Sequence, residues 1–64
     1  MNAARLASVY ARVMRDAIEF LRKTATELRE LAAYGPDIAD QLRRLADELD
    51  AAADELEERG GESA

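Results

Sequence analysis

A single break between two long stretches without glycine or proline most constrains what this chain can fold into. Residues 3–33 and 37–59 contain neither residue and are rich in Ala, Leu, Arg and Glu, which are strong helix formers. Between them stands Gly35-Pro36, where Gly suits the position after a helix end and Pro suits the first turn of the next helix. The sequence therefore predicts a first helix over about 3–33, a turn at 34–36 and a second helix over about 37–59.

The short turn also sets the direction of the two helices. Helices joined by so few residues lie side by side and antiparallel. We therefore expect an all-α fold in which residues 1–64 form one antiparallel helical hairpin. Gly60-Gly61 is expected to end the second helix and to leave 60–64 as a frayed tail.

Apolar residues in both helices recur at alternating steps of three and four, which places them on one helix face. The seam of the second helix is flanked by alanines at a spacing of seven, so small and large side chains stand next to each other. The predicted core combines Met14, Ile18, Leu21, Leu28 and Leu31 with Ile38, Leu42, Leu45, Leu49 and Leu56. Tyr10 is expected to fill the end of this core near the N-terminus.

This core is thin for a chain that folds alone. A domain near 64 residues buries only about 60% of its unfolded surface, and 14 of the residues here are alanine. The chain has no cysteine or histidine, so neither disulfides nor an ordinary zinc site can compensate. Oligomerisation is the remaining route to stability. We expect a homo-oligomer in which the hairpin dimerises into a four-helix bundle, with a tetramer and both parallel and antiparallel pairing left open.

A second stripe of large apolar residues follows the first helix through its N-terminal two-thirds: Leu6, Val9, Val13 and Phe20. Glu27 takes the next position at the same spacing, so the stripe ends there. Four large apolar side chains in one line would otherwise face water, which indicates an interface. With Tyr10, these residues are predicted to contact another copy of the chain or the helix of a heterologous protein.

Charge is divided unevenly between the two halves of the chain. Residues 1–34 carry six basic and four acidic groups, a net +2, whereas residues 35–64 carry three basic and ten acidic groups, a net −7. Opposite charges favour the hairpin, and pairs four residues apart, such as Arg43 with Asp47, add support within each helix. The basic face of the first helix offers candidate RNA or anion contacts at Arg5, Arg12, Arg15 and Arg22, although the overall charge of −5 argues against broad nucleic-acid binding.

Composition excludes several classes of function. Without histidine or cysteine the chain lacks a thiol nucleophile, an imidazole base and a soft metal site, so we expect no enzyme, no cofactor and no metal. No apolar run approaches the roughly 20 residues of a membrane span, which predicts no membrane insertion. The first residues show no secretion signal, and a cytoplasmic location is expected.

Two short segments resemble the Rop (repressor of primer) family of plasmid regulators: Asp37-Ile38 followed by Leu42, and Ala46-Asp47-Glu48-Leu49. A weaker similarity lies in Ala11-Arg12 and Arg15. The resemblance implies an antiparallel dimer of hairpins and, in that family, binding of paired RNA hairpins by the outer face of the first helix. No functional residue is carried over, because Val9 and Val13 stand where that face has basic, amide or aromatic side chains.

We therefore expect a non-catalytic protein that acts through self-association, through docking of a protein partner on the second stripe, or through both. Two alternatives remain. One is a regulator similar to Rop that binds RNA through the basic face of the first helix. The other is a purely structural bundle, natural or engineered, that has no ligand.

Overall fold

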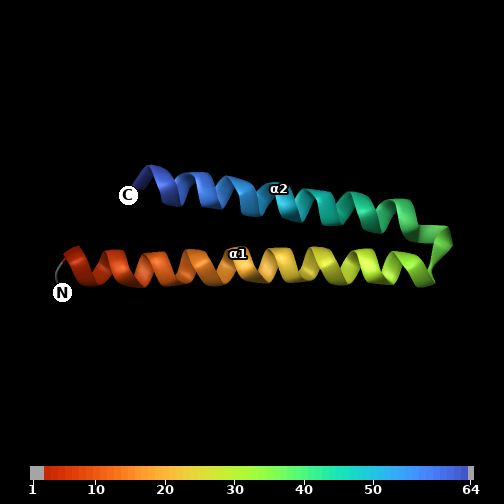
Figure 1. The fold of residues 1–64 in the computed structure, drawn as a ribbon, viewed down its shortest axis with the longest axis horizontal. Coiled ribbons are helices and arrows are strands. Elements are labelled where there is room, and N and C mark those ends of the chain that lie inside the picture. Colours follow the sequence, from red (N-terminus) through yellow and green to blue (C-terminus); the bar gives the residue numbers. More distant parts are fainter. Residues whose placement is uncertain (1–2, 64) are drawn as a thin grey trace.

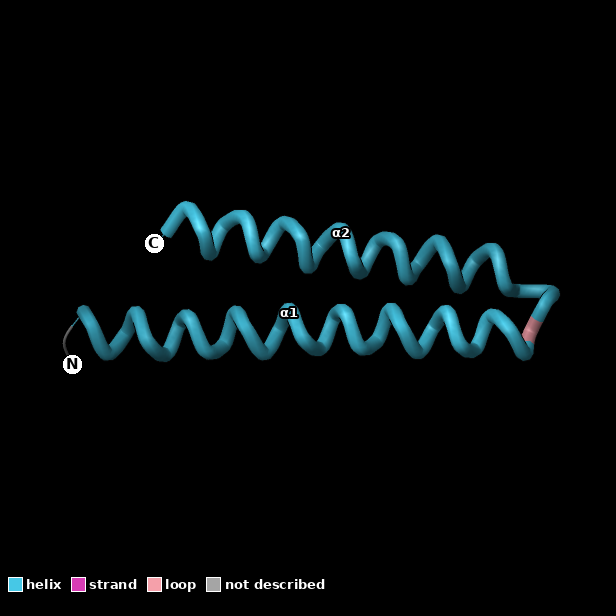
Figure 2. Tube along the Cα trace, in the orientation of Figure 1, coloured by secondary structure: helices cyan, strands magenta, loops and turns pink. Residues whose placement is uncertain are grey.

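A computed structural model describes residues 3–63. They form α1 (Ala3–Tyr34), one short 3-10 helix, η1 (Pro36–Ile38), and α2 (Ala39–Ser63). The two long helices run antiparallel and side by side, and both chain ends lie at the end of the molecule opposite the turn (Figure 1, Figure 2). The predicted all-α helical hairpin is confirmed, and its dimerisation stays a prediction.

The second helix does not end at residue 59 as predicted. α2 continues through Gly60 and Gly61 to Ser63. In the described part of the chain no residue has a positive φ, so neither glycine adopts the left-handed conformation that commonly ends a helix. A glycine costs a helix about 1 kcal/mol relative to alanine, but it permits helical geometry. The predicted frayed tail is thus helical as far as Ser63, and Ala64 lies outside the described residues.

The turn is shorter than predicted and is held by backbone hydrogen bonds. Gly35 lies outside helical geometry, with φ −126° and ψ 75°. Its N–H donates to the carbonyl oxygen of Leu31 at 3.1 Å, and its own carbonyl oxygen accepts from the N–H of Ile38 at 3.1 Å. Pro36 starts η1, where its missing N–H leaves no helical hydrogen bond unmade. Tyr34 consequently belongs to α1, and the predicted start of the second helix is a 3-10 helix.

Alanines make the closest contact between α1 and α2. The buried hydrophobic residues of the described part are Ala25, Ala32, Ala39, Ala46 and Ala53. They follow the seven-residue spacing of the sequence, and their small side chains let the helix axes approach closely. No large side chain among the described residues is fully buried. The hairpin is therefore closed by the flanking alanines rather than by the leucines beside them.

The helices diverge toward the end that holds both termini (Figure 1). Sequence explains where this happens. Ile18 stands seven residues before Ala25 and takes the place of an alanine in the contact. Its larger side chain holds the axes farther apart than the alanine pairs near the turn do. The hairpin is consequently narrow at the turn and wider at its open end.

The hairpin is a single layer of helices. Its Cα atoms span 52 × 17 × 11 Å, and the radius of gyration is 15.2 Å. A compact chain of this length has a radius of gyration of about 11 Å. The accessible surface is 5186 Å², whereas a compact monomer of this mass exposes about 4,100 Å². Domains normally consist of two packed layers, whereas this hairpin forms one.

Candidate functional site

The alanine contact divides the hairpin into two sides of different chemistry. Consecutive residues of a helix point about 100° apart, so a leucine and the charged residue after it flank the contact on opposite sides. This occurs twice on α1, at Leu21-Arg22 and Leu28-Arg29, and three times on α2, at Leu42-Arg43, Leu49-Asp50 and Leu56-Glu57. We call the apolar side the leucine face: Leu21, Leu28, Leu31, Ile38, Leu42, Leu45, Leu49 and Leu56. We call the charged side the arginine edge: Arg22, Arg29, Asp47, Asp50, Asp54 and Glu57.

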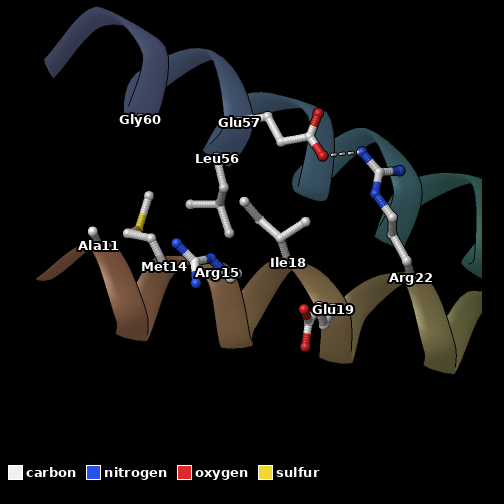
Figure 3. Close-up of a pocket in the computed structure, with 9 residues that line it drawn as sticks. All are labelled: Ala11, Met14, Arg15, Ile18, Glu19, Arg22, Leu56, Glu57 and Gly60. Carbon is white, nitrogen blue, oxygen red and sulfur yellow. Dashed lines mark hydrogen bonds and ion pairs between the residues drawn. The ribbon is translucent and has the colours of Figure 1, made fainter. Parts of the chain in front are cut away.

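Arg22 is the centre of the arginine edge. Its Nη2 donates to Glu57 Oε1 at 2.8 Å and to Asp54 Oδ1 at 3.0 Å, and its Nη1 lies 3.8 Å from Asp50 Oδ1. Glu57 reaches over from α2 to make this contact (Figure 3). The hydrogen bonds to Glu57 and then to Asp54 raise the pKa of Arg22 above its ordinary value. This guanidinium therefore ties α1 to α2.

Arg29 repeats the arrangement one heptad closer to the turn. Its Nη2 lies 2.9 Å from Asp47 Oδ1 and 2.8 Å from Asp50 Oδ2. The hydrogen bonds to Asp47 and then to Asp50 raise the pKa of Arg29. Asp50 is shared between the two arginines. The edge is exposed to solvent, with about two-fifths of each arginine side chain accessible, so its contribution is one of register and pairing rather than of burial.

Sequence reasoning missed these bridges because it paired charges within each helix. Asp47 was expected to pair with Arg43, but it contacts Arg29 of the other helix, and Arg43 lies 3.8 Å from Asp40. A signal was present in the sequence. Arg22 and Arg29 are seven residues apart, as are Asp47 and Asp54, and as are Asp50 and Glu57. Matching repeats of opposite charge on antiparallel helices indicate bridges between the helices.

The leucine face is only half covered by the hairpin itself. Leu31, Ile38 and Leu45 are exposed at 56%, 49% and 49%, and the other leucines of the face are half-buried. Eight of the ten predicted core residues thus gather on one side, whereas Met14 and Ile18 point between the helices (Figure 3). The eight do not form a closed core within one chain. That side is open and is contributed to by both helices.

The residues predicted as an interface on the first helix are all exposed: Leu6, Val9, Tyr10, Val13 and Phe20, with exposed fractions of 52–67%. They lie on the N-terminal two-thirds of α1, away from the turn. Of the candidate anion contacts, Arg22 is engaged with carboxylates of α2, and Arg12 and Arg15 are exposed on α1. The structure therefore does not gather the four predicted arginines into one site.

A groove of about 520 Å³ opens where the helices diverge. Met14 and Ile18 of α1 and Leu56 of α2 point toward one another between the helices (Figure 3). Ala11 and Gly60 also line the groove and leave room because they are small. The groove is thus a gap between separating helices, with apolar walls and charged rims.

Among the side chains that the structure describes, those of residues 3–60, no group of three or more Asp or Glu is placed to hold a metal ion. Neither helix in that range has a segment both long and apolar enough to cross a bilayer.

Comparison with known proteins assigns no family: no family model matches the chain, and neither a curated protein nor a solved structure is significantly similar to it.

Proposed function

We propose that this protein is a non-catalytic assembly module and that two copies associate through the leucine face to form a four-helix bundle. The observation that carries the proposal is the open leucine face on a protomer only one helix layer thick. A second layer would cover the half-buried leucines and complete the core predicted from the sequence.

The exposed surface of the hairpin is large enough for a second hairpin to bind. The hairpin exposes 5186 Å², about 1,100 Å² more than a compact monomer of its mass. A stable protein interface covers about 800 Å² on each partner. The excess surface is therefore enough for one complete interface, and the long axis of 52 Å gives a second hairpin room to lie along the first.

A second copy of the same chain is the occupant that the chemistry favours. Both helices contribute leucines to the face, and alanines stand between them, so two such faces can interdigitate large side chains with small ones. A two-fold axis makes such a contact twice with the same residues and closes the assembly. The resemblance to the Rop family implies the same kind of dimer.

Sedimentation equilibrium over a wide concentration range tests the proposal. We expect at least two chains per particle for the wild type and a smaller particle for Leu45→Glu. Leu45 is suited to the test because it is 49% exposed in the protomer, so the substitution leaves the alanine contact intact.

Ala51→Glu is the matched control, since Ala51 is an exposed position of α2 outside the leucine face. It introduces the same charge on the same helix and should leave the mass unchanged. A wild-type monomer at every concentration, or a Leu45→Glu variant with wild-type mass, would disprove the assembly through this face.

A further inference from the structure

The second stripe lies beyond the area that a hairpin on the leucine face would cover. Ala25 faces α2, so angles around the axis of α1 can be measured from it. Leu21 and Leu28 point about 40–60° away from this direction. The residues of the second stripe point farther away, by about 120–160° for Val13, Phe20 and Val9. They continue the apolar surface round to the outer side of α1. Phe20 is the most exposed of them, at 67%. A dimer formed through the leucine face would leave this outer side open to water.

α2 offers no equivalent apolar surface on its own outer side. Gln41, Glu48 and Glu55 occupy those positions, and all are exposed. The second stripe therefore has no counterpart on α2 of another copy. Within this chain, its one apolar counterpart is the same stripe on a second α1.

The stripe is complementary to itself when two copies of α1 run antiparallel about Val13. Leu6 stands seven residues before Val13 and Phe20 seven residues after it, so each Leu6 meets the partner copy's Phe20. On one flank Tyr10 meets Ala17, which sets a large side chain against a small one. The order of the residues thus gives each chain the same contacts with the other, as a two-fold interface requires.

Charges at the border of the stripe fit the same antiparallel pairing. Arg12 and Asp16 lie on one flank of the stripe, just before and after Val13. Antiparallel pairing brings Asp16 of one copy near Arg12 of the other, twice. Parallel pairing about a two-fold axis would instead place this flank on opposite sides of the contact in the two copies, so that Arg12 of one copy does not meet Asp16 of the other.

We propose that the second stripe is a self-association surface, at which α1 of one copy pairs antiparallel with α1 of another copy about Val13. The inference extends the proposed function: the leucine face joins two hairpins, and the second stripe joins such dimers to one another. The assembly is then larger than two chains.

Particle mass separates the two surfaces. We expect Val13→Arg to reduce the wild-type assembly to a dimer, and Val13→Arg combined with Leu45→Glu to give a monomer. Val13 is 59% exposed, so the substitution does not disturb the contact between α1 and α2. Ser8→Arg is the matched control, because it adds the same charge to an exposed position on another side of the same half of α1.

Introduced cysteines test the pairing and its direction. The chain has no cysteine of its own, so each added thiol is the only one. Under oxidation, Val13→Cys is expected to give disulfide-linked chains in high yield. Leu6→Cys alone is not, because antiparallel pairing about Val13 separates the two thiols by about 14 residues, or about 21 Å along the helices. A mixture of Leu6→Cys and Phe20→Cys chains is expected to cross-link, and Ser8→Cys sets the background from collisions.

Each outcome bears on one surface or the other. If Val13→Arg keeps the wild-type mass, or if Val13→Cys cross-links no more than Ser8→Cys, the second stripe does not join copies of this chain. Efficient cross-linking of Leu6→Cys to itself would overturn the antiparallel direction. If Leu45→Glu keeps the wild-type mass while Val13→Arg lowers it, the self-association surface stands and the proposed role of the leucine face fails.

Discussion

The arginine edge and the leucine face flank the same alanine contact. The side chains of the arginine edge find partners within the chain, whereas those of the leucine face stay partly exposed. On the arginine edge, Arg22 and Arg29 reach across to carboxylates of α2 at 2.8–3.0 Å. On the leucine face, Leu31, Ile38 and Leu45 remain about half exposed. Charged side chains are long and can meet across two helices, whereas a leucine needs atoms above it as well as beside it.

This difference separates the residues that hold the hairpin together from those that, under the proposed assembly, contact a second copy. Alanines at the contact and charges at the edge are enough to align two helices in register. They bury little apolar surface, because alanine presents a single methyl group. Burial of apolar side chains stabilises a fold, and most of the large apolar side chains of this sequence stay partly in water in a lone hairpin.

The largest effect is expected from Leu49→Ala, on the leucine face. If a second hairpin covers this side, the substitution removes a buried leucine and should lower the free energy of unfolding by about 2–5 kcal/mol. Urea unfolding followed by circular dichroism at two protein concentrations measures the loss and its dependence on concentration. Asp50→Ala, its neighbour on the arginine edge, should cost much less. A Leu49→Ala loss below about 1 kcal/mol at both concentrations would mean that the leucine face stays in water.

Ala46→Leu tests the contact that separates the two sides. Ala46 is fully buried between the helices, and a larger side chain there forces the axes apart, at a cost of about 1–3 kcal/mol. Thermal unfolding measures the cost. Ala51→Leu makes the same change at an exposed position of α2 and should be nearly neutral. Equal stability of the two variants would show that the helices have room between them at Ala46.

How much of this arrangement the sequence predicts depends on the range of the interaction. The helices, the turn and the apolar spacing are local properties, and Gly35-Pro36 was enough to predict an antiparallel hairpin. Pairing across the helices is not local, which is why Asp47 was assigned to Arg43 rather than to Arg29. The end of α2 was predicted too early because a glycine such as Gly60 can adopt helical geometry as well as end a helix. Exposure of the second stripe was predicted correctly, since no position on α2 remained to cover it.

Gly35→Ala asks whether the turn or the helix faces decide which side is open. Gly35 has a negative φ, and a Cβ there would lie 3.5 Å from Ile38 Cγ1, an ordinary contact. Alanine restricts the unfolded chain more than glycine does, so we expect a gain of about 0.4–1 kcal/mol in the free energy of unfolding. The particle mass should not change, because the helix faces are untouched. A loss of stability, or a new mass, would assign the turn a role in orienting the two sides.

The smallest effect is expected from Arg22→Gln, which breaks the arginine edge at its centre. Arg22 is exposed, so water and salt screen its contacts, and the loss should be smaller than that of Ala46→Leu and should fade as NaCl rises toward 1 M. Arg15→Gln removes the same charge one heptad earlier, where the described side chains of residues 3–60 offer it no ion pair, and should show no such salt dependence. Because the contacts raise the pKa of Arg22, their contribution is fully present below the unfolded pKa of arginine and is lost only in strong alkali. The difference between wild type and Arg22→Gln should therefore stay constant from about pH 7 to about pH 9. A loss that persists in high salt would mean that the arginine edge is held by more than charge, and the contrast with the leucine face would be weaker than the exposure of the two sides indicates.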